Sequence, residues 1–181
     1  MSHKAFLNPT SVIERAGVHD GMHVADFGAG SGFFTRAAAR AVGEKGVVWA
    51  VDLNRDLLTR LKNISVAEGL TNVEIICGNV EQARGSHLPA SKFDFVIIAN
   101  LLFGLEDKRA CADEAHRVLK PGAHALVVDW KGSFGGLGPH PDHVLSEEDA
   151  RALFTSAGFS IEGEVASGGY HWGFVVRKKT E

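Results

Sequence analysis

Short apolar runs alternate with longer amphipathic stretches along most of the chain. Apolar runs of about four to eight residues, closed by glycine or a polar turn, are typical of buried strands, whereas apolar positions three and four residues apart are typical of helices. The pattern predicts strands over residues 23–27, 47–51, 73–77, 93–99, 124–129, 160–165 and 170–177. It predicts helices over about residues 11–16, 33–42, 54–67, 107–119 and 146–157.

Two of these boundaries depend on local signals. Ser11 and Glu14 have the spacing of a capping box, which places the start of the first helix at Ser11, and Gly17 ends it. Residues 120–122, Lys-Pro-Gly, are expected to end the fourth helix and to precede the next strand, because proline and glycine do not continue a helix.

The order of the elements predicts a mostly parallel sheet. Strands that alternate with helices pair in parallel through right-handed crossovers, and strands that are apolar on both faces are covered by helices on both sides. Only residues 166–169 separate the last two strands, which permits a hairpin but no helical crossover. The expected fold is an α/β domain with an open, mostly parallel sheet of seven strands, helices on both faces and a C-terminal antiparallel hairpin.

The chain is predicted to form one domain over residues 1–181. Its composition, 45% hydrophobic and 23% charged, is ordinary for a globular domain with its own core. Residues 1–20 are expected to form a helical segment that covers the site. Residues 131–145 form a long loop rich in glycine, proline and histidine, and loops of that length usually serve a function.

Charge and composition narrow the classes of partner. The formal net charge of -3 gives no clear basic patch for nucleic acid, and no stretch approaches the roughly 20 apolar residues of a membrane span. The N-terminus lacks the pattern of a signal peptide, and the two cysteines fit free thiols, so a cytoplasmic location is expected. The expected partner is a small-molecule substrate, and a homodimer stays open.

A glycine-rich turn joins the first predicted strand to the following helix. Glycines stand at positions 28, 30 and 32, soon after Asp26. Glycine lets the backbone approach a ligand closely, and a helix N-terminus offers free N–H groups. Asp52 ends the next strand, where a carboxylate can accept hydrogen bonds from both ribose hydroxyls of an adenosine. Together the two features predict a site for an adenosine-containing ligand at the carboxyl ends of the strands.

The glycine spacing differs from the dinucleotide fingerprint, because Phe33 stands where that fingerprint has its third glycine. The sequence instead resembles the class I S-adenosylmethionine-dependent methyltransferases, and the resemblance covers almost the whole chain. It is carried by residues 24–32 (Val-Ala-Asp-Phe-Gly-Ala-Gly-Ser-Gly), 51–53 (Val-Asp-Leu), 93–100 (Phe-Asp-Phe-Val-Ile-Ile-Ala-Asn) and 117–123 (Arg-Val-Leu-Lys-Pro-Gly-Ala). The general pattern is similar to methyltransferases of quinone biosynthesis, without their extra substrate-covering elements.

This resemblance implies a Rossmann-like fold, S-adenosylmethionine as the cofactor and transfer of its methyl group by in-line displacement. It assigns the amino-acid tail of the cofactor to Asp26 and the glycine turn, and the ribose to Asp52. The implied cofactor-binding residues are Asp26, Gly28, Ala29, Gly30, Gly32, Asp52, Leu53, Asn79, Val80 and Asn100. Asn79 stands where relatives often carry aspartate, and its amide oxygen can accept the same hydrogen bond.

Segments expected over the strand ends supply candidates for the acceptor side, where aromatic residues suit an apolar pocket. The candidates are Asn100, Trp130, His140, His143 and His171. No catalytic residue is assigned, because the methyl group of the cofactor is already activated and a general base is needed only when the acceptor keeps its proton. Residues 140–143, His-Pro-Asp-His, lack the spacing and further ligands of a metal site, so no metal is expected. Phe33 and Phe34 are expected in the core.

Three other functions stay open beside methyl transfer to a small molecule. A protein or RNA acceptor could dock against an open site, although Leu-Leu-Phe follows Asn100 in place of the Asn-Pro-Pro-Tyr motif of nucleic-acid methyltransferases. A nucleotide-binding oxidoreductase is disfavoured by Phe33 and by the closing hairpin. The third alternative is a non-catalytic module that keeps the cofactor fold.

Overall fold

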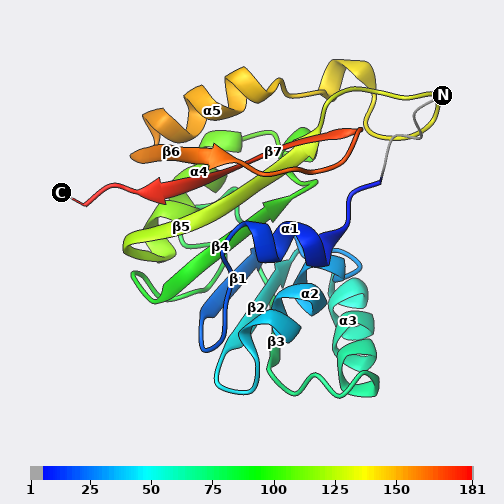
Figure 1. Ribbon diagram of the computed structural model, residues 1–181, viewed down its shortest axis with the longest axis vertical. Helices are drawn as coiled ribbons and strands as arrows, with labels where there is room; N and C mark the ends of the chain where they lie inside the picture. Colours follow the sequence, from blue (N-terminus) through cyan, green and yellow to red (C-terminus); the bar gives the residue numbers. More distant parts are fainter. Residues whose placement is uncertain (1–5, 181) are drawn as a thin grey trace.

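A twisted sheet of seven strands forms the centre of the protein, in the order β3-β2-β1-β4-β5-β7-β6 (Figure 1). The computed structural model describes residues 6–180. The strands are β1 (His23–Phe27), β2 (Val47–Asp52), β3 (Val73–Cys77), β4 (Phe93–Ala99), β5 (Leu119–Trp130), β6 (Phe159–Glu164) and β7 (His171–Lys178). Strands β1 to β5 pair in parallel, and β7 lies antiparallel between β5 and β6. The predicted fold class is confirmed.

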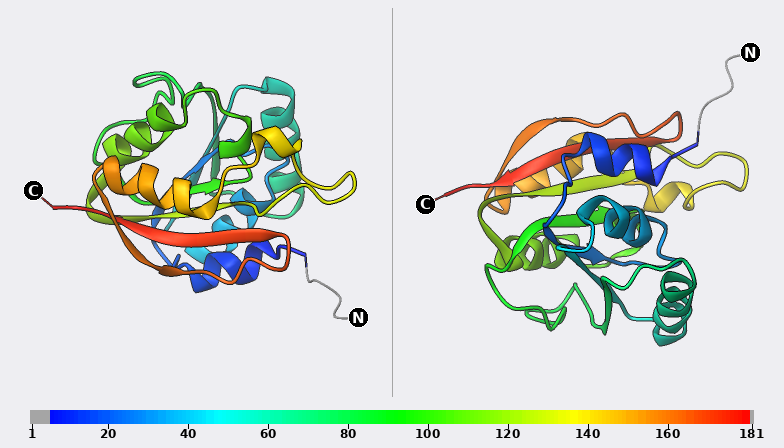
Figure 2. Two further views of the ribbon diagram at one scale, coloured as in Figure 1. Left: turned by 90° about the horizontal axis from the view of Figure 1, so that it is seen from above. Right: turned by 60° about the horizontal axis from the view of Figure 1, so that its bottom comes forward.

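Helices cover both faces of the sheet, so apolar residues on both sides of the central strands are buried. Figure 2 shows α1 and α2 on one side and α4 and α5 on the other. The helices are α1 (Pro9–Arg15), α2 (Phe33–Val42), α3 (Arg55–Ala67), α4 (Lys108–Val118) and α5 (Glu147–Ser156), with short 3₁₀ turns η1 (Leu102–Gly104) and η2 (Pro141–His143). Two-sided burial explains the continuous apolar strands of the sequence.

The strand register brings several chain segments to one edge of the sheet. Phe27 at the end of β1 pairs with Val51 of β2 and with Ile98 of β4. On the far side of β4, Trp130 at the end of β5 pairs with His171 at the start of the antiparallel strand β7. The turns after β1, β2 and β4 therefore lie beside the β5 end and the β7 start, at the edge where open α/β sheets bind ligands.

The first helix begins earlier than the sequence analysis predicts. Its N-cap is Asn8, whose side-chain oxygen accepts the backbone N–H of Ser11 at 3.2 Å, and Pro9 is the first helical residue. The predicted capping box at Ser11 is wrong, because proline is preorganised for the first helical position and an asparagine stands just before it. Residues 1–5 of the expected N-terminal segment lie outside the described residues.

Strand β5 also begins earlier than predicted, directly after α4. Leu119 pairs with Phe93, and the ladder resumes with His124 opposite Phe95, so a bulge lies between the two pairs. Pro121 falls in this bulge, where the missing N–H of proline is tolerated. Helix α4 ends at Val118, shortly before Pro121. The chain then continues directly into β5, without the separate turn that the sequence analysis predicts.

No helix within residues 6–180 is long and apolar enough to cross a membrane.

Candidate cofactor and acceptor site

The glycine turn after β1 is held at both ends and open in the middle. Gly28, Gly30 and Gly32 have φ of +69°, +52° and +76°, which side-chain-bearing residues rarely adopt. A Cβ added at Gly28 would meet the Leu101 side chain at 2.5 Å, and one at Gly32 would meet Leu61 at 2.1 Å. A Cβ at Gly30 would meet only the Gly28 carbonyl oxygen, at 3.9 Å. The open side of the turn at Gly30 is therefore free to take a ligand.

Asp52 lies directly beside this turn. One carboxylate oxygen accepts the backbone N–H of Gly30 at 2.8 Å, and the other accepts that of Asn54 at 2.8 Å. Asn54 is the N-cap of α3, since its side-chain oxygen accepts the N–H groups of Asp56 and Leu57. The predicted juxtaposition of the glycine turn and the acid is thus present, with each carboxylate oxygen keeping further lone pairs for a ligand.

A small cavity of about 80 Å³ lies on the Asp52 side of the turn. Leu53 forms one wall and leaves 62% of its surface exposed, which is unusual for a leucine next to a buried strand. Asn79 forms another wall, and its side-chain oxygen accepts the N–H of Glu81 at 2.9 Å. The lining residues are Gly28, Val51, Asp52, Leu53, Gly78, Asn79, Val80, Glu81, Leu101 and Leu105.

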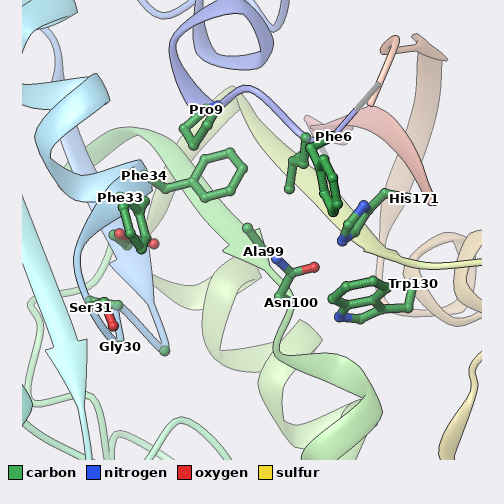
Figure 3. Close-up of a pocket in the computed structure, with 14 residues that line it drawn as sticks. Phe6, Pro9, Gly30, Ser31, Phe33, Phe34, Ala99, Asn100, Trp130 and His171 are labelled. Carbon is green, nitrogen blue, oxygen red and sulfur yellow. The ribbon is translucent and has the colours of Figure 1, made fainter. Parts of the chain in front are cut away.

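A larger cavity of about 510 Å³ lies on the other side of the turn (Figure 3). Gly28 lines both cavities, so the glycine turn separates them. The walls of the larger cavity are mostly apolar and aromatic, as in sites for small organic molecules. They are Phe6, Leu7, Pro9, Asp26, Gly28, Ala29, Gly30, Ser31, Phe33, Phe34, Ala99, Asn100, Trp130 and His171.

Comparisons with known proteins identify the family. A family model described as a methyltransferase domain matches residues 18–158, which include the glycine turn, Asp52 and Trp130. The chain belongs to the class I S-adenosylmethionine-dependent methyltransferases. S-adenosylmethionine is the cofactor of this family.

Individual relatives agree with this assignment. The ubiquinone/menaquinone biosynthesis C-methyltransferase UbiE of Burkholderia vietnamiensis is 33% identical over 118 residues, which are 65% of this chain and 47% of that protein. The chain spans about half the length of the curated relatives it matches. A S-adenosylmethionine-dependent methyltransferase from Aquifex aeolicus has a TM-score of 0.86 at 30% identity, covering 95% of this chain and 90% of that one. The [4+2]-cyclase SpnF, at 17% identity and a TM-score of 0.78 over 96% of this chain and 81% of that one, shares the fold alone.

The residues around the glycine turn fit a methyltransferase cofactor. The cofactor has an amino-acid tail joined through its sulfur to an adenosine, and here two cavities meet at Gly28. Gly30 leaves the volume of a Cβ free beside the turn. Asp52 faces the small cavity with its remaining lone pairs, and the exposed Leu53 offers an apolar surface next to it. Gly32 lines neither cavity; it closes the turn against Leu61 instead.

Asp26 is a buried carboxyl in the wall of the larger cavity, with 2% of its surface exposed. Burial raises its pKa to about 7, and the nearby Asp52 carboxylate adds to the rise, while a hydrogen bond from the Thr35 hydroxyl at 2.5 Å opposes it. A positively charged group in the cavity would favour the ionised form. Asp26 is thus suited to hold the ammonium group of a methyltransferase cofactor.

Three of the predicted acceptor-side residues come together at the far end of the larger cavity. Figure 3 shows Asn100 below Ala99 at the end of β4, with Trp130 and His171 across from it. Asn100 has φ of +53°, a strained conformation of the kind that gathers at functional sites. The ring centroids of Trp130 and His171 are 4.1 Å apart, so the two side chains form one wall.

The other two predicted acceptor-side histidines lie elsewhere. His140 and His143 flank or belong to η2, and neither lines the larger cavity. His140 is largely exposed and lies 3.3 Å from Asp142. Within residues 6–180, no group of three or more His, Cys, Asp or Glu side chains is placed to hold a metal ion.

Phe33 is not in the core, contrary to the prediction from sequence. It is 64% exposed and lines the larger cavity, whereas its neighbour Phe34, which also lines the cavity, is buried. Phe33 lies on the face of α2 that also carries Arg36 and Arg40, so the helical periodicity turns its side chain away from the sheet. The guanidinium of Arg36 lies 5.4 Å from the Phe33 ring centroid and helps to hold it there.

Asp129 is a buried residue that the sequence analysis did not single out. Its carboxylate accepts the N–H groups of Phe103 at 3.2 Å and Trp130 at 2.8 Å, which ties η1 to the end of β5. Burial raises the pKa of Asp129 to about 6. Asp129 follows an apolar run at the end of its strand, as Asp26 and Asp52 do, and this pattern could have identified it from the sequence.

Proposed function

We propose that the domain transfers a methyl group from S-adenosylmethionine to a small, largely apolar molecule bound in the larger cavity. The observation that carries the proposal is the position of the glycine turn, which separates a small cavity beside Asp52 from a 510 Å³ aromatic cavity. The cofactor supplies a methyl group already activated by the positive charge on its sulfur. The protein must then bring the acceptor into line with that methyl group and exclude water.

The proposed cofactor contacts follow the two cavities. Asp52 accepts hydrogen bonds from the ribose hydroxyls, and Leu53 and Val80 pack against the adenine. Asn79 keeps a free lone pair and its amide donors for the adenine edge, because Glu81 occupies only one lone pair of the oxygen. The backbone at Gly28, Ala29 and Gly30 lines the amino-acid tail, and Asp26 pairs with its ammonium group.

The proposed acceptor lies beyond the tail, between Phe34, Asn100 and Trp130. An apolar body gains from contact with the aromatic walls, and few polar groups are present to orient it. The first of the curated relatives is named as a C-methyltransferase of ubiquinone and menaquinone biosynthesis, which supports a small organic acceptor. Of the cavity-lining residues, Phe6 and Phe33 remain more than half exposed at the rim, where an acceptor would enter.

Thermal-shift titration tests the cofactor part of the proposal. S-adenosylmethionine and S-adenosylhomocysteine are expected to raise the melting temperature, because a ligand of the folded state stabilises it. NAD is expected to have no effect. Stabilisation by NAD alone would favour the oxidoreductase alternative and overturn the assignment.

Turnover tests the transfer itself. The protein is incubated with tritium-labelled S-adenosylmethionine and a panel of small apolar acceptors, with bulk protein and RNA as separate arms. Labelled small-molecule product supports the proposal, and label on protein or RNA alone replaces it with a macromolecular acceptor. If the protein binds the cofactor but no small molecule, protein or RNA becomes labelled, the result supports the alternative of a non-catalytic binding module.

A further inference from the structure

The imidazole of His171 is buried in the acceptor end of the larger cavity, and no residue of the described part of the chain forms a hydrogen bond with it. Only 3% of its surface is exposed. Neither ring nitrogen has a partner among residues 6–180. Figure 3 shows the ring between Phe6 and Trp130, with its edge turned toward the space in front of Asn100.

An unpaired buried imidazole costs free energy, because each polar nitrogen loses its hydrogen bond to water without a replacement. Most buried polar groups in folded proteins are paired. The position on β7 does not require a histidine, since an apolar residue of similar size would pack against Trp130 without this cost. The free nitrogens therefore point to a ligand that supplies the missing partner.

The surroundings keep this imidazole neutral. Burial lowers the pKa of His171 to about 4, and the positive charge of Lys131 adds to the effect. Asp26 lines the same cavity, and Arg15, Glu147 and Glu164 line a neighbouring cavity that His171 also borders. A neutral imidazole has one nitrogen that donates and one that accepts a hydrogen bond.

These properties select the polar group of the ligand. A carboxylate would be paired best by a charged imidazolium, which burial disfavours here. A hydroxyl can donate to or accept from a neutral ring and buries no charge. The aromatic rings of Trp130 and Phe6 lie on either side of His171 and line the cavity. They suit a ligand whose hydroxyl is attached to a flat, apolar ring system.

We infer that His171 is a specificity-determining residue that hydrogen-bonds a hydroxyl group on a planar, apolar methyl acceptor. The inference rests on the proposed function, because it assigns the polar contact of the same acceptor cavity. Methylated product is not needed to test it, since the contact exists in the bound state before any transfer.

A matched pair of probes isolates the hydroxyl. 2-Naphthol and 2-methylnaphthalene have nearly the same size and shape, but only the first can hydrogen-bond. Both are titrated into the protein saturated with S-adenosylhomocysteine, and their affinities are measured by calorimetry or by quenching of tryptophan fluorescence. We expect 2-naphthol to bind about 3- to 10-fold more tightly, as one added hydrogen bond predicts. 2-Naphthoate is expected to bind more weakly than 2-naphthol.

Two variants locate the contact. In His171→Phe the preference for 2-naphthol should disappear while 2-methylnaphthalene binds within about twofold of the wild type. In His171→Gln part of the preference should return, because the amide can donate and accept. His140→Phe, on the exposed loop, is the matched control and should keep the full preference. Each variant is used only after its melting temperature and its affinity for S-adenosylhomocysteine match those of the wild type.

Nuclear magnetic resonance of the wild type makes the test independent of any variant. The ring signals of His171 should shift with 2-naphthol and stay nearly unchanged with 2-methylnaphthalene. Equal binding of both probes, or a preference that survives in His171→Phe, overturns the role of His171 and leaves the proposed function standing. Failure of both probes to bind, with S-adenosylhomocysteine still bound, overturns the apolar small-molecule acceptor and the inference with it.

Discussion

The backbone N–H of Gly30 donates a hydrogen bond to the carboxylate of Asp52 over 2.8 Å. The contact joins the turn after β1 to the end of β2, two features separated by 22 residues in the chain. It fixes the distance between the backbone that would cradle an amino-acid tail and the carboxylate that would hold a sugar. The geometry of the two half-sites is thus set before any ligand arrives, which lowers the entropic cost of binding.

Replacing Asp52 with alanine should weaken the binding of S-adenosylhomocysteine by about 1–3 kcal/mol, because charge-assisted hydrogen bonds to the ribose are lost. Calorimetry at constant pH gives the affinity. Glu44→Ala, an exposed acid in the turn before β2 at the opposite edge of the sheet, is the control and should bind normally. An unchanged affinity in Asp52→Ala would remove this residue from the site.

Binding of S-adenosylhomocysteine at pH 7 should release protons from Asp26. Its pKa of about 7 leaves the carboxyl partly protonated in the free protein, and a bound ammonium group favours the ionised form. Calorimetry in two buffers of different ionisation enthalpy measures the protons released. Asp26→Asn should release none from this position, whereas Thr35→Val should release more, because the hydrogen bond that lowers the pKa is gone. Equal heats in both buffers for the wild type would contradict the prediction.

Alanine at two neighbouring glycines should separate folding from binding. Gly30→Ala puts its Cβ into open space, so it should cost only the left-handed backbone penalty of about 1–2 kcal/mol while blocking the ligand side of the turn. Gly28→Ala pays the same penalty and also forces its Cβ against Leu101. Chemical denaturation and titration with S-adenosylhomocysteine measure the two effects. We expect Gly30→Ala to lose affinity with the smaller loss of stability; the reverse order would contradict the open cradle.

The pKa of His171 should make the free protein sensitive to mild acid. Because burial lowers this pKa to about 4, below the value near 6.5 of an unfolded histidine, the unfolded chain binds the additional proton as the pH falls between these values. Stability is fully present above pH 6.5 and declines toward pH 4, by up to about 3 kcal/mol from this group. Urea denaturation of His171→Phe should show a shallower decline over this range. His140→Phe should follow the wild type, and identical slopes for all three proteins would refute the prediction.

The sequence was sufficient for the order of the elements and for the position of Asp52 beside the glycine turn. Short apolar runs followed by glycine or by a polar turn mark β1 to β4, and the central strands β1 and β4 are apolar almost throughout because both of their faces are buried. Adjacent parallel strands then necessarily bring the turn at Gly28 next to Asp52. Local signals and simple pairing rules carry this part of the structure.

The acceptor half depends on contacts that no local pattern records. His171 reaches the cavity only because β7 inserts between β5 and β6, which places it opposite Trp130. His140 looked equally suitable in the sequence, yet the turn at η2 leaves it exposed. The positions of His171 and His140 therefore follow from strand pairing and from a loop turn rather than from periodicity.

The pairing of Trp130 with His171 means that one wall of the cavity is built from the last strand of the sheet, while Phe6 closes it from near the other end of the chain. The glycine turn and the small cavity proposed to hold the cofactor, in contrast, come from one stretch of the chain between Asp26 and Leu105. Under the proposed function, changes at the two ends would alter which molecule is accepted without disturbing the part that binds the methyl donor. The same core can in this way serve new acceptors through a few replacements near its ends.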